Sequence, residues 1–169
     1  MTLQALILLT LSWGRILGAL SGEPAEDQFG EEVVWSAFSA KPFVLVIADR
    51  DASDNARIIG AALHTSFNGN YTAPETHLRS TMPSEQVKII PVAALPDVPG
   101  VFKWLFRRGF RKEATTGVIL DWDSRLSKAC GYTTGTVRLV IKVPTREDPT
   151  ILDVSNAQTA VEAVRAAVL

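Results

Sequence analysis

The sequence predicts a single α/β domain built on a mixed β-sheet with helices on both faces. Buried-strand patterns that alternate with helical patterns predict parallel βαβ units in the first two thirds of the chain. Two alternating segments joined by a proline-bounded turn then predict an antiparallel hairpin, and a last helix follows. The 169 residues are 47% apolar with a formal net charge of −1, which suits one folded domain and argues against global disorder.

The expected elements follow one another without a repeat. They are an edge strand at 32–38, a strand at 43–48, a helix at 53–67, a strand at 87–93, a helix at 100–110, a strand at 117–120, a short helix at 127–130, a hairpin of 136–143 and 150–154, and a helix from 155 onward.

Local patterns support these elements. The two central strands are continuous apolar runs, as expected of strands buried on both faces, although Pro91 in the second predicts a strand end or bulge. The first helix has its apolar residues on one face, and Ser53 or Asp51 can cap it. The final helix begins with a capping box formed by Ser155 and Gln158.

The N-terminal residues predict a secretory signal peptide. Residues 3–11 are almost wholly apolar, and 19–21 supply the small residues that a signal peptidase recognises. The apolar run is shorter than the ~20 residues of a membrane span. No basic residue precedes the run and Arg15 interrupts it, so an uncleaved anchor and an ordinary extension stay open. We expect a signal peptide at 1–21, one domain at 22–169, and a periplasmic or secreted location.

The composition excludes several kinds of site. Cys130 is the only cysteine, so an intrachain disulfide and a multi-cysteine zinc or iron–sulfur site are excluded. Two histidines argue against a histidine-rich metal site, and the near-neutral net charge argues against nucleic acid as a partner. We therefore expect no metal and no cofactor.

Two segments follow recognisable patterns. Residues 44–57 form a strand, a turn and a helix start. Residues 121–132 resemble the pattern D-x-x-G-x-(L/V)-(A/S)-K-A-(Y/L)-G-(V/L), with Ser124, Cys130 and Tyr132 as departures. The chain resembles thioredoxin-like proteins of the redoxin type in these segments, and more narrowly exported proteins of the YtfJ type. The resemblance covers residues 30–169. It implies a thioredoxin-like three-layer α/β/α sandwich with a mixed central sheet and a C-terminal β-hairpin plus helix.

The departures from this family concern its redox site. Aligning the strands puts Ser53-Asp54-Asn55-Ala56 where the resemblance implies Cys-x-x-Cys, and a serine hydroxyl cannot form a stable disulfide. The family's cis-proline before the hairpin is also missing, because 133–136 contain no proline. We expect a non-catalytic, exported binding or accessory protein without thiol–disulfide activity. Asp49, Asp51, Ser53 and Ala56 would form its vestigial active-site turn.

Two enzymatic alternatives stay open. Cys130 could serve a one-cysteine redox mechanism, although a lone cysteine is more often a small buried hydrophobe. The segments 49–53 and 121–124 also fit strand-D-x-D, the first motif of haloacid-dehalogenase-like phosphatases. The second strand ends without the required Ser or Thr, and no Asp-Asp motif follows. We therefore expect these aspartates to act as helix caps.

Residues 101–112 are the strongest outlier in composition. Helical spacing puts an apolar set on one face, which we expect to pack on the core, and a basic set on the other, which we expect to be solvated. The apolar set is Val101, Phe102, Leu105, Phe106 and Phe110, and the basic set is Lys103, Arg107, Arg108 and Arg111. Trp104 lies among the basic residues, an arrangement that suits an anionic membrane surface or an acidic protein partner. The candidate partner surface is Trp104, Arg107, Arg108 and Arg111.

Overall fold

The computed structural model describes residues 25–38, 40–69, 86–95, 98–113 and 117–168. Its elements are, in order, β1 (Glu26–Asp27), η1 (Trp35–Phe38), β2 (Phe43–Ala48), α2 (Ser53–Asn68), β3 (Lys88–Ala94), α3 (Gly100–Glu113), β4 (Ile119–Asp121), η2 (Trp122–Ser124), α4 (Arg125–Ala129), β5 (Val137–Lys142), β6 (Thr150–Val154) and α5 (Ala157–Val168). The expected signal peptide at 1–21 lies outside the described residues and stays a prediction.

The strands form one six-stranded mixed sheet in the order β1-β4-β3-β2-β5-β6. β3 pairs in parallel with β2 and β4, while β5 runs antiparallel to β2 and forms the hairpin with β6. Every residue of β2 is buried, and Leu45 lies between Ile90 of β3 and Val140 of β5. The predicted parallel units, mixed sheet and C-terminal hairpin are confirmed.

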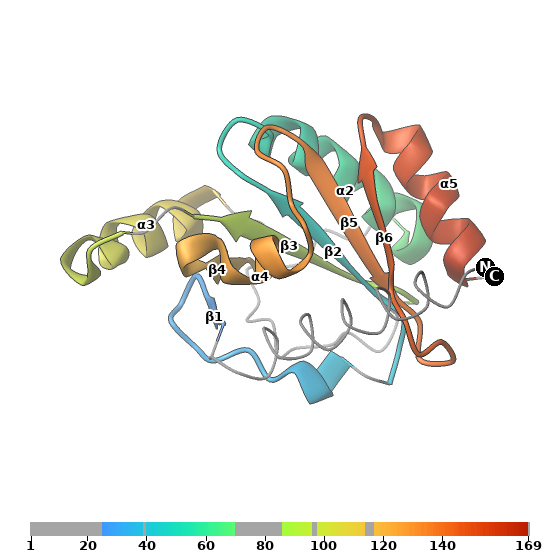
Figure 1. Cartoon of the computed structure of the whole chain (residues 1–169), viewed down its shortest axis with the longest axis horizontal. Helices are drawn as coiled ribbons and strands as arrows, with labels where there is room; N and C mark the ends of the chain where they lie inside the picture. Colours follow the sequence, from blue (N-terminus) through green and yellow to red (C-terminus); the bar gives the residue numbers. More distant parts are fainter. Residues whose placement is uncertain (1–24, 39, 70–85, 96–97, 114–116, 169) are drawn as a thin grey trace, which may run out of the picture.

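The two faces of the sheet bury different sets of residues. On one face α2 and α5 lie side by side and pack on the strands through Ile59, Leu63 and Val164 (Figure 1). On the other face η1 and α4 cover the sheet through Phe38 and Leu126. These layers agree with the predicted three-layer sandwich. Among the described residues, no helix combines the length and apolar character needed to cross a bilayer.

The predicted edge strand at 32–38 is wrong. The edge of the sheet is instead β1, which pairs antiparallel with β4, and Glu32 contributes only an isolated bridge to Glu26. Within 32–38, Val33 and Phe38 are both buried, and Phe38 packs against Phe43 at a ring distance of 6.4 Å. A turn of 3₁₀ helix over the sheet face buries these side chains better than an alternating edge strand would.

The helix caps differ from the expected ones by a few residues. Asn156 caps α5, because its Oδ1 accepts the Thr159 N–H at 2.9 Å; Ser155 does not perform this role. At α2, Asp49 Oδ1 accepts the Ala52 N–H at 3.1 Å, while the Ser53 hydroxyl donates to the Arg50 carbonyl. Asp, Asn and Ser have similar cap preferences, so the sequence alone does not separate neighbouring candidates.

β3 continues through Pro91 without ending there. Pro91 pairs with Val46 of β2, whereas β4 begins to pair with β3 only at Val92. At Pro91, β3 is paired with β2 on one side only, because its pairing with β4 begins one residue later. The missing N–H of Pro91 therefore removes no hydrogen bond between β3 and β4.

α3 differs most from expectation, because its apolar face does not join the core. Figure 1 shows the helix extending away from the sheet. Exposure is 70% at Val101, 50% at Phe102, 46% at Leu105 and 38% at Phe106. Only Phe110 packs against a buried cluster, the small one formed by Leu95, Val118 and Leu120.

Candidate functional site

The turn between β2 and α2 is held to the loop that precedes β5. Asp49 Oδ2 accepts the Gly135 N–H at 2.8 Å, and its backbone N–H donates to the Tyr132 hydroxyl at 2.9 Å. That hydroxyl donates in turn to the Thr136 carbonyl at 2.9 Å, and burial raises the Tyr132 pKa. The Asp49 carboxylate therefore joins two loops at this corner, and it accepts the N–H of Ala52, the residue before α2, instead of capping an N–H within the helix.

The other residues of the predicted turn lie around Asp49 at the start of α2. Asp51 and Ser53 are exposed, and Ala56 is half-buried against the core formed by α2 and α5. Residues 53–56 form the first turn of α2 immediately after the corner. The structure thus brings Asp49, Asp51, Ser53 and Ala56 together, and the exposed side chains among these four are the Asp51 carboxylate and the Ser53 hydroxyl.

Arg138 completes this corner and was not singled out from the sequence. Its guanidinium forms two hydrogen bonds with Asp153, at 2.8 and 2.7 Å, and also donates to the Cys130 and Gly131 carbonyls. The ion pair raises the Arg138 pKa and lowers the Asp153 pKa. Arg138 and Asp153 are register partners in the hairpin, so strand alternation was the signal that could have revealed them.

Cys130 lies under the sheet at the end of α4. It is 4% exposed, in the cluster that contains Leu126 and Ile119. Burial raises the pKa of the thiol to about 12, and the nearby Asp121 carboxylate adds to the shift. The thiolate, which is the reactive form of cysteine, is therefore scarce near neutral pH.

Asp121 is fully occupied as the cap of α4. Its two carboxylate oxygens accept the Leu126 N–H at 3.0 Å, the Ser127 N–H at 2.8 Å and the Ser127 hydroxyl. Asp121 is also 5% exposed. In the part of the chain that the structure describes, no three His, Cys, Asp or Glu side chains are grouped as metal ligands would be.

The candidate partner surface on α3 divides into two parts. Arg107 forms a bidentate ion pair with Glu26 of β1, at 2.6 and 2.7 Å, and Glu26 also accepts the Trp122 indole N–H. Arg111 donates to the Gln28 and Phe29 carbonyls. These two arginines hold α3 against the body of the protein.

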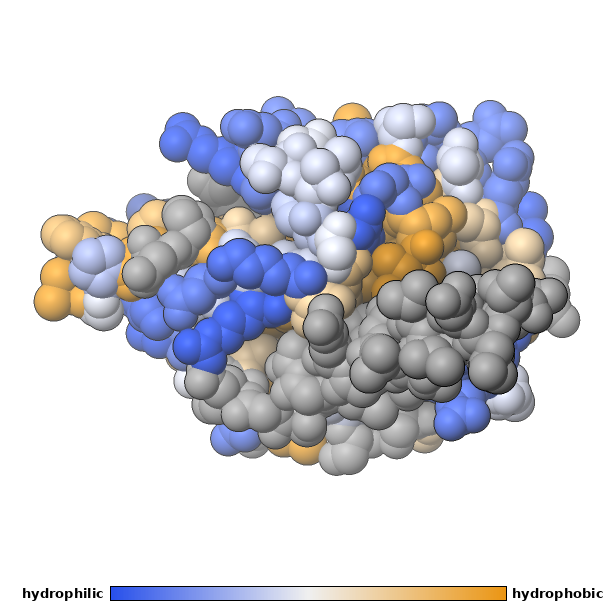
Figure 2. Space-filling model, viewed as in Figure 1, coloured by the Kyte–Doolittle hydropathy of each residue, from blue (hydrophilic) through white to orange (hydrophobic). Residues whose placement is uncertain are grey.

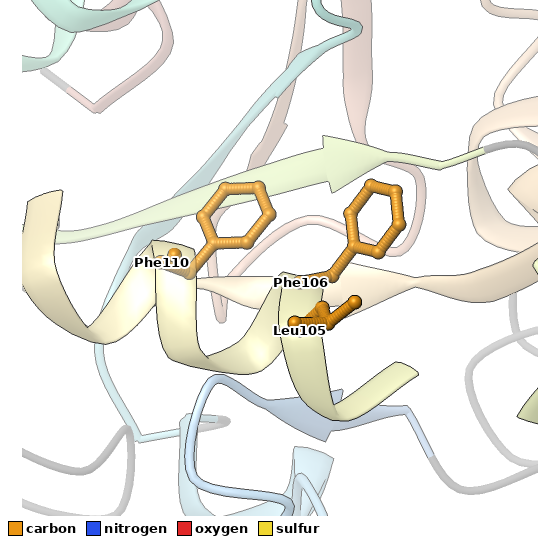
Figure 3. Close-up of a pocket in the computed structure, with 4 residues that line it drawn as sticks. Leu105, Phe106 and Phe110 are labelled. Carbon is orange, nitrogen blue, oxygen red and sulfur yellow. The ribbon is translucent and has the colours of Figure 1, made fainter. Parts of the chain in front are cut away.

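Trp104 and Arg108 form the other part, and among the described residues no hydrogen bond or ion pair joins either one to the body. Trp104 is 54% exposed and Arg108 is exposed. Beside them lies a shallow hollow of about 300 Å³, lined by Leu105, Phe106, Gly109 and Phe110. Figure 3 shows the rings of Phe106 and Phe110 on the same side of the helix. The structure therefore leaves an apolar surface next to Trp104 that the sequence placed in the core.

The described structure is similar to several solved structures. No protein-family model matches the sequence, and no curated protein matches it significantly. DsbF of MTB superimposes with a TM-score of 0.57 at 16% identity, covering 88% of this chain and 96% of that one. A secreted Mycobacterium tuberculosis disulfide oxidoreductase homologous to E. coli DsbE gives 0.54 at 12% identity, with coverages of 88% and 97%.

A peroxide-reducing protein has the same arrangement of elements. The bacterioferritin comigratory protein of Xanthomonas campestris, which has alkyl peroxide reduction activity, gives a TM-score of 0.54 at 15% identity. The alignment covers 88% of this chain and 92% of that protein. Identities this low establish the fold alone. With its mixed six-stranded sheet and terminal hairpin and helix, this chain has the thioredoxin-like fold of disulfide oxidoreductases and peroxiredoxins, with a single cysteine and no Cys-x-x-Cys pair.

Proposed function

We propose that this protein is an exported thioredoxin-fold protein that acts by binding, without thiol–disulfide exchange. The observation that supports this most strongly is the corner after β2, where Ser53 and Ala56 begin α2 in place of two thiols. A disulfide exchange cycle needs a thiolate attacker and a resolving thiol, and neither is present at this corner. The fold is therefore used for recognition or support.

The closed hydrogen bonding of the corner also supports a binding role. Asp49 already accepts the Gly135 N–H, and Tyr132 already bridges Asp49 and Thr136. These bonds join the turn after β2 to the loop before β5. A rigid, occupied corner suits a scaffold better than a site that must exchange covalent partners.

Both enzymatic alternatives have less support. A mechanism through Cys130 requires a thiol that is 4% exposed and has a pKa of about 12 to become an accessible thiolate. A phosphatase mechanism requires Asp49 or Asp121 as a free nucleophile, but both oxygens of each carboxylate accept hydrogen bonds. No specific observation favours either alternative over binding.

The redox part of the proposal is tested with the purified full chain. Insulin reduction in the presence of dithiothreitol and peroxide consumption in the presence of a thiol reductant should stay at the rate without protein. Turnover that disappears in Cys130→Ser would replace the binding role with a one-cysteine mechanism. The phosphatase alternative predicts Mg²⁺-dependent hydrolysis of an aryl phosphate that is lost in Asp49→Asn or Asp121→Asn, and we expect no such hydrolysis.

The exported location is supported by the pattern at the N-terminus. The apolar run at 3–11 and the small residues at 19–21 fit a cleaved signal, and the similar Mycobacterium tuberculosis oxidoreductase is a secreted protein. N-terminal sequencing of the protein recovered from outside the cytoplasm should begin at Gly22. A sequence that begins at Met1 there would contradict cleavage.

A further inference from the structure

We propose that α3 is an interfacial helix that binds the surface of an anionic lipid bilayer. This inference deepens the binding role proposed above and rests on it, since it names the partner that the exposed surface of α3 fits. Three features of the helix support it: one face is fixed to the body, the opposite face is apolar and exposed, and the charged side chains that the structure describes on that face, Arg108 and Lys112, are basic.

The fixed face determines which side of α3 is presented to solvent. The Arg107 ion pair with Glu26 is mostly buried, with side-chain exposures of 29% and 19%, and Arg111 lies over the Phe29 ring. Lys103 lies 4.8 Å from the centre of the Trp122 ring, and Phe106 meets the same ring edge-on at 6.1 Å. These contacts come from successive turns on one side, so the helix cannot rotate about its axis without breaking them.

The opposite face combines large apolar side chains with basic ones. Its apolar members are Val101, Phe102 and Leu105, between 46% and 70% exposed, and Trp104, 54% exposed, lies at the border of this face beside Arg107 and Arg111. Helical spacing places Arg108 and Lys112 within the same arc, and both are exposed. The ion pairs between described residues do not include either one.

The position of α3 makes this face accessible. In Figure 1 the helix projects from one end of the sheet, and Figure 2 shows hydrophobic surface gathered at the tip of this projection with hydrophilic surface behind it. Fourteen residues correspond to a helix of ~21 Å, which suits a helix lying in the plane of an interface. Such a helix places its apolar side chains ~5–10 Å into the boundary between headgroups and acyl chains.

Charge complementarity favours an anionic bilayer over a second copy of this chain. In a symmetric contact between two copies, Arg108 and Lys112 would meet the same face of the partner, on which the described charged side chains are also basic. On this face of α3 basic residues lie beside apolar ones, and this mixture favours a bilayer over a groove on another protein as the binding partner. Charges are depleted at the centre of protein interfaces, whereas at a bilayer long basic side chains reach the headgroups beside inserted apolar groups.

The test measures sedimentation of the full chain with vesicles. One set of vesicles contains phosphatidylcholine with phosphatidylglycerol, and the other contains phosphatidylcholine alone. We expect binding to the anionic vesicles that weakens as sodium chloride is raised. Leu105→Ser should reduce the affinity about tenfold, because it removes one inserted side chain. Arg108→Glu with Lys112→Glu should reduce the affinity about a hundredfold.

The chain offers matched control positions on α2. Ile58 is 61% exposed, and the Arg57 side chain is 81% exposed. Ile58→Ser and Arg57→Glu make the same kinds of change away from α3 and should leave vesicle binding unchanged. All variants keep residues 1–21, so any lipid affinity of that segment is common to them and cancels in the comparison. The intensity and position of tryptophan emission should change with anionic vesicles, and much less so in Trp104→Phe.

The proposal is overturned if the α3 variants bind anionic vesicles as tightly as the wild type. It is also overturned if the chain ignores vesicles but binds an acidic polypeptide such as polyglutamate through Arg108 and Lys112, since the partner would then be a protein. Thiol-dependent turnover would refute the non-catalytic role without altering vesicle binding. A failure to bind vesicles would leave the redox result unchanged. Failure of the membrane proposal and failure of the non-catalytic role are therefore distinguishable.

Discussion

At the scale of single residues, the aspartates at the ends of the strands serve the structure. Asp49 follows β2 and Asp121 is the last residue of β4, so both lie at the carboxyl ends of strands, where ligands bind in many α/β proteins. Here the Asp121 carboxylate accepts N–H groups of α4, and the Asp49 carboxylate accepts the N–H groups of Ala52, just before α2, and of Gly135. Charge-assisted bonds of this kind stabilise the turns, and they leave little capacity for chemistry.

The buried thiol predicts a specific dependence of stability on alkaline pH. The folded pKa of Cys130 is about 12 against an ordinary value of 9.0, so the unfolded protein loses this proton first. The contribution of the neutral Cys130 thiol to the free energy of unfolding is fully present below pH 9 and is lost as the pH rises toward 12. Unfolding by urea should show the free energy of unfolding falling by up to ~1.4 kcal/mol per pH unit in this window.

Cys130→Ala is the control for this prediction. The alanine variant is less stable at neutral pH but should lack the part of the alkaline slope that the thiol causes. The raised pKa of Tyr132 acts with the same sign above pH 10, and it contributes equally to both proteins. Equal slopes in the two proteins would contradict the assignment of Cys130 as a buried neutral thiol.

Gly131 tests the packing of the loop after α4. Its φ of +68° favours glycine, and an added Cβ would lie 2.9 Å from the Arg138 guanidinium. Gly131→Ala should therefore lower the free energy of unfolding by about 1–2 kcal/mol in chemical denaturation. Gly60→Ala is the matched control, because Gly60 lies inside α2 with open space around its Cα. It should raise the same quantity by ~0.5–1 kcal/mol.

At the scale of elements, α3 depends on a few contacts at one edge of the sheet. Glu26 of β1 joins Arg107 and Trp122 into one network, and this network takes the place of a packed apolar face. An element with so little buried apolar area should open more readily than the rest of the fold. The attachment of α3 is therefore governed by polar contacts that a single substitution can weaken.

Glu26→Gln tests this attachment. The variant keeps the shape of the side chain but removes the charge that pairs with Arg107, so protection of the α3 amides from hydrogen exchange should fall about tenfold, or ~1.4 kcal/mol. Asp54→Asn breaks the fully exposed pair with Arg57 and should leave exchange unchanged. Unchanged α3 exchange in Glu26→Gln would show that apolar contacts alone hold the helix.

The elements show where sequence patterns are informative. Continuous apolar runs identified β2 and β3 because burial on both faces excludes polar residues. Helical periodicity predicted that Phe102 and Leu105 of α3 pack in the core, but both side chains are exposed. Periodicity shows that a helix is amphipathic, and it does not show which surface the apolar face contacts. The prediction of an edge strand at 32–38 was wrong because apolar residues that pack over the face of a sheet have the same sequence pattern as residues that form one of its strands.

At the scale of the whole molecule, the fold does not determine the function. The chain has the arrangement of thioredoxin-like oxidoreductases, yet its single cysteine is buried just after α4, outside the turn at 53–56 where the family pattern implies the thiols. The sequence was sufficient to find the residues of that corner, since they are consecutive along the chain. It was not sufficient to find Arg138 and Asp153, whose pairing depends on the register of the hairpin.

Charge is also distributed unevenly over the whole molecule. The net charge is −1, while α3 contains five basic residues and one acidic residue. Two of the five, Arg107 and Arg111, form hydrogen bonds with Glu26 and with the Gln28 carbonyl. The number of basic residues in α3 is therefore larger than the number whose charge is available to bind a partner. The exposed surface is defined by Trp104, Arg108 and the apolar residues beside them.

The most direct test of the account compares insulin reduction by the wild type and by Ser53→Cys with Ala56→Cys. Ser53 and Ala56 lie in the first turn of α2, at the positions where the resemblance to redoxins implies a Cys-x-x-Cys pair. The wild type should show no turnover above the reaction without protein, and the double variant should gain measurable turnover from a thiol pair at a helix N-terminus. Turnover by the wild type equal to that of the double variant would contradict the account.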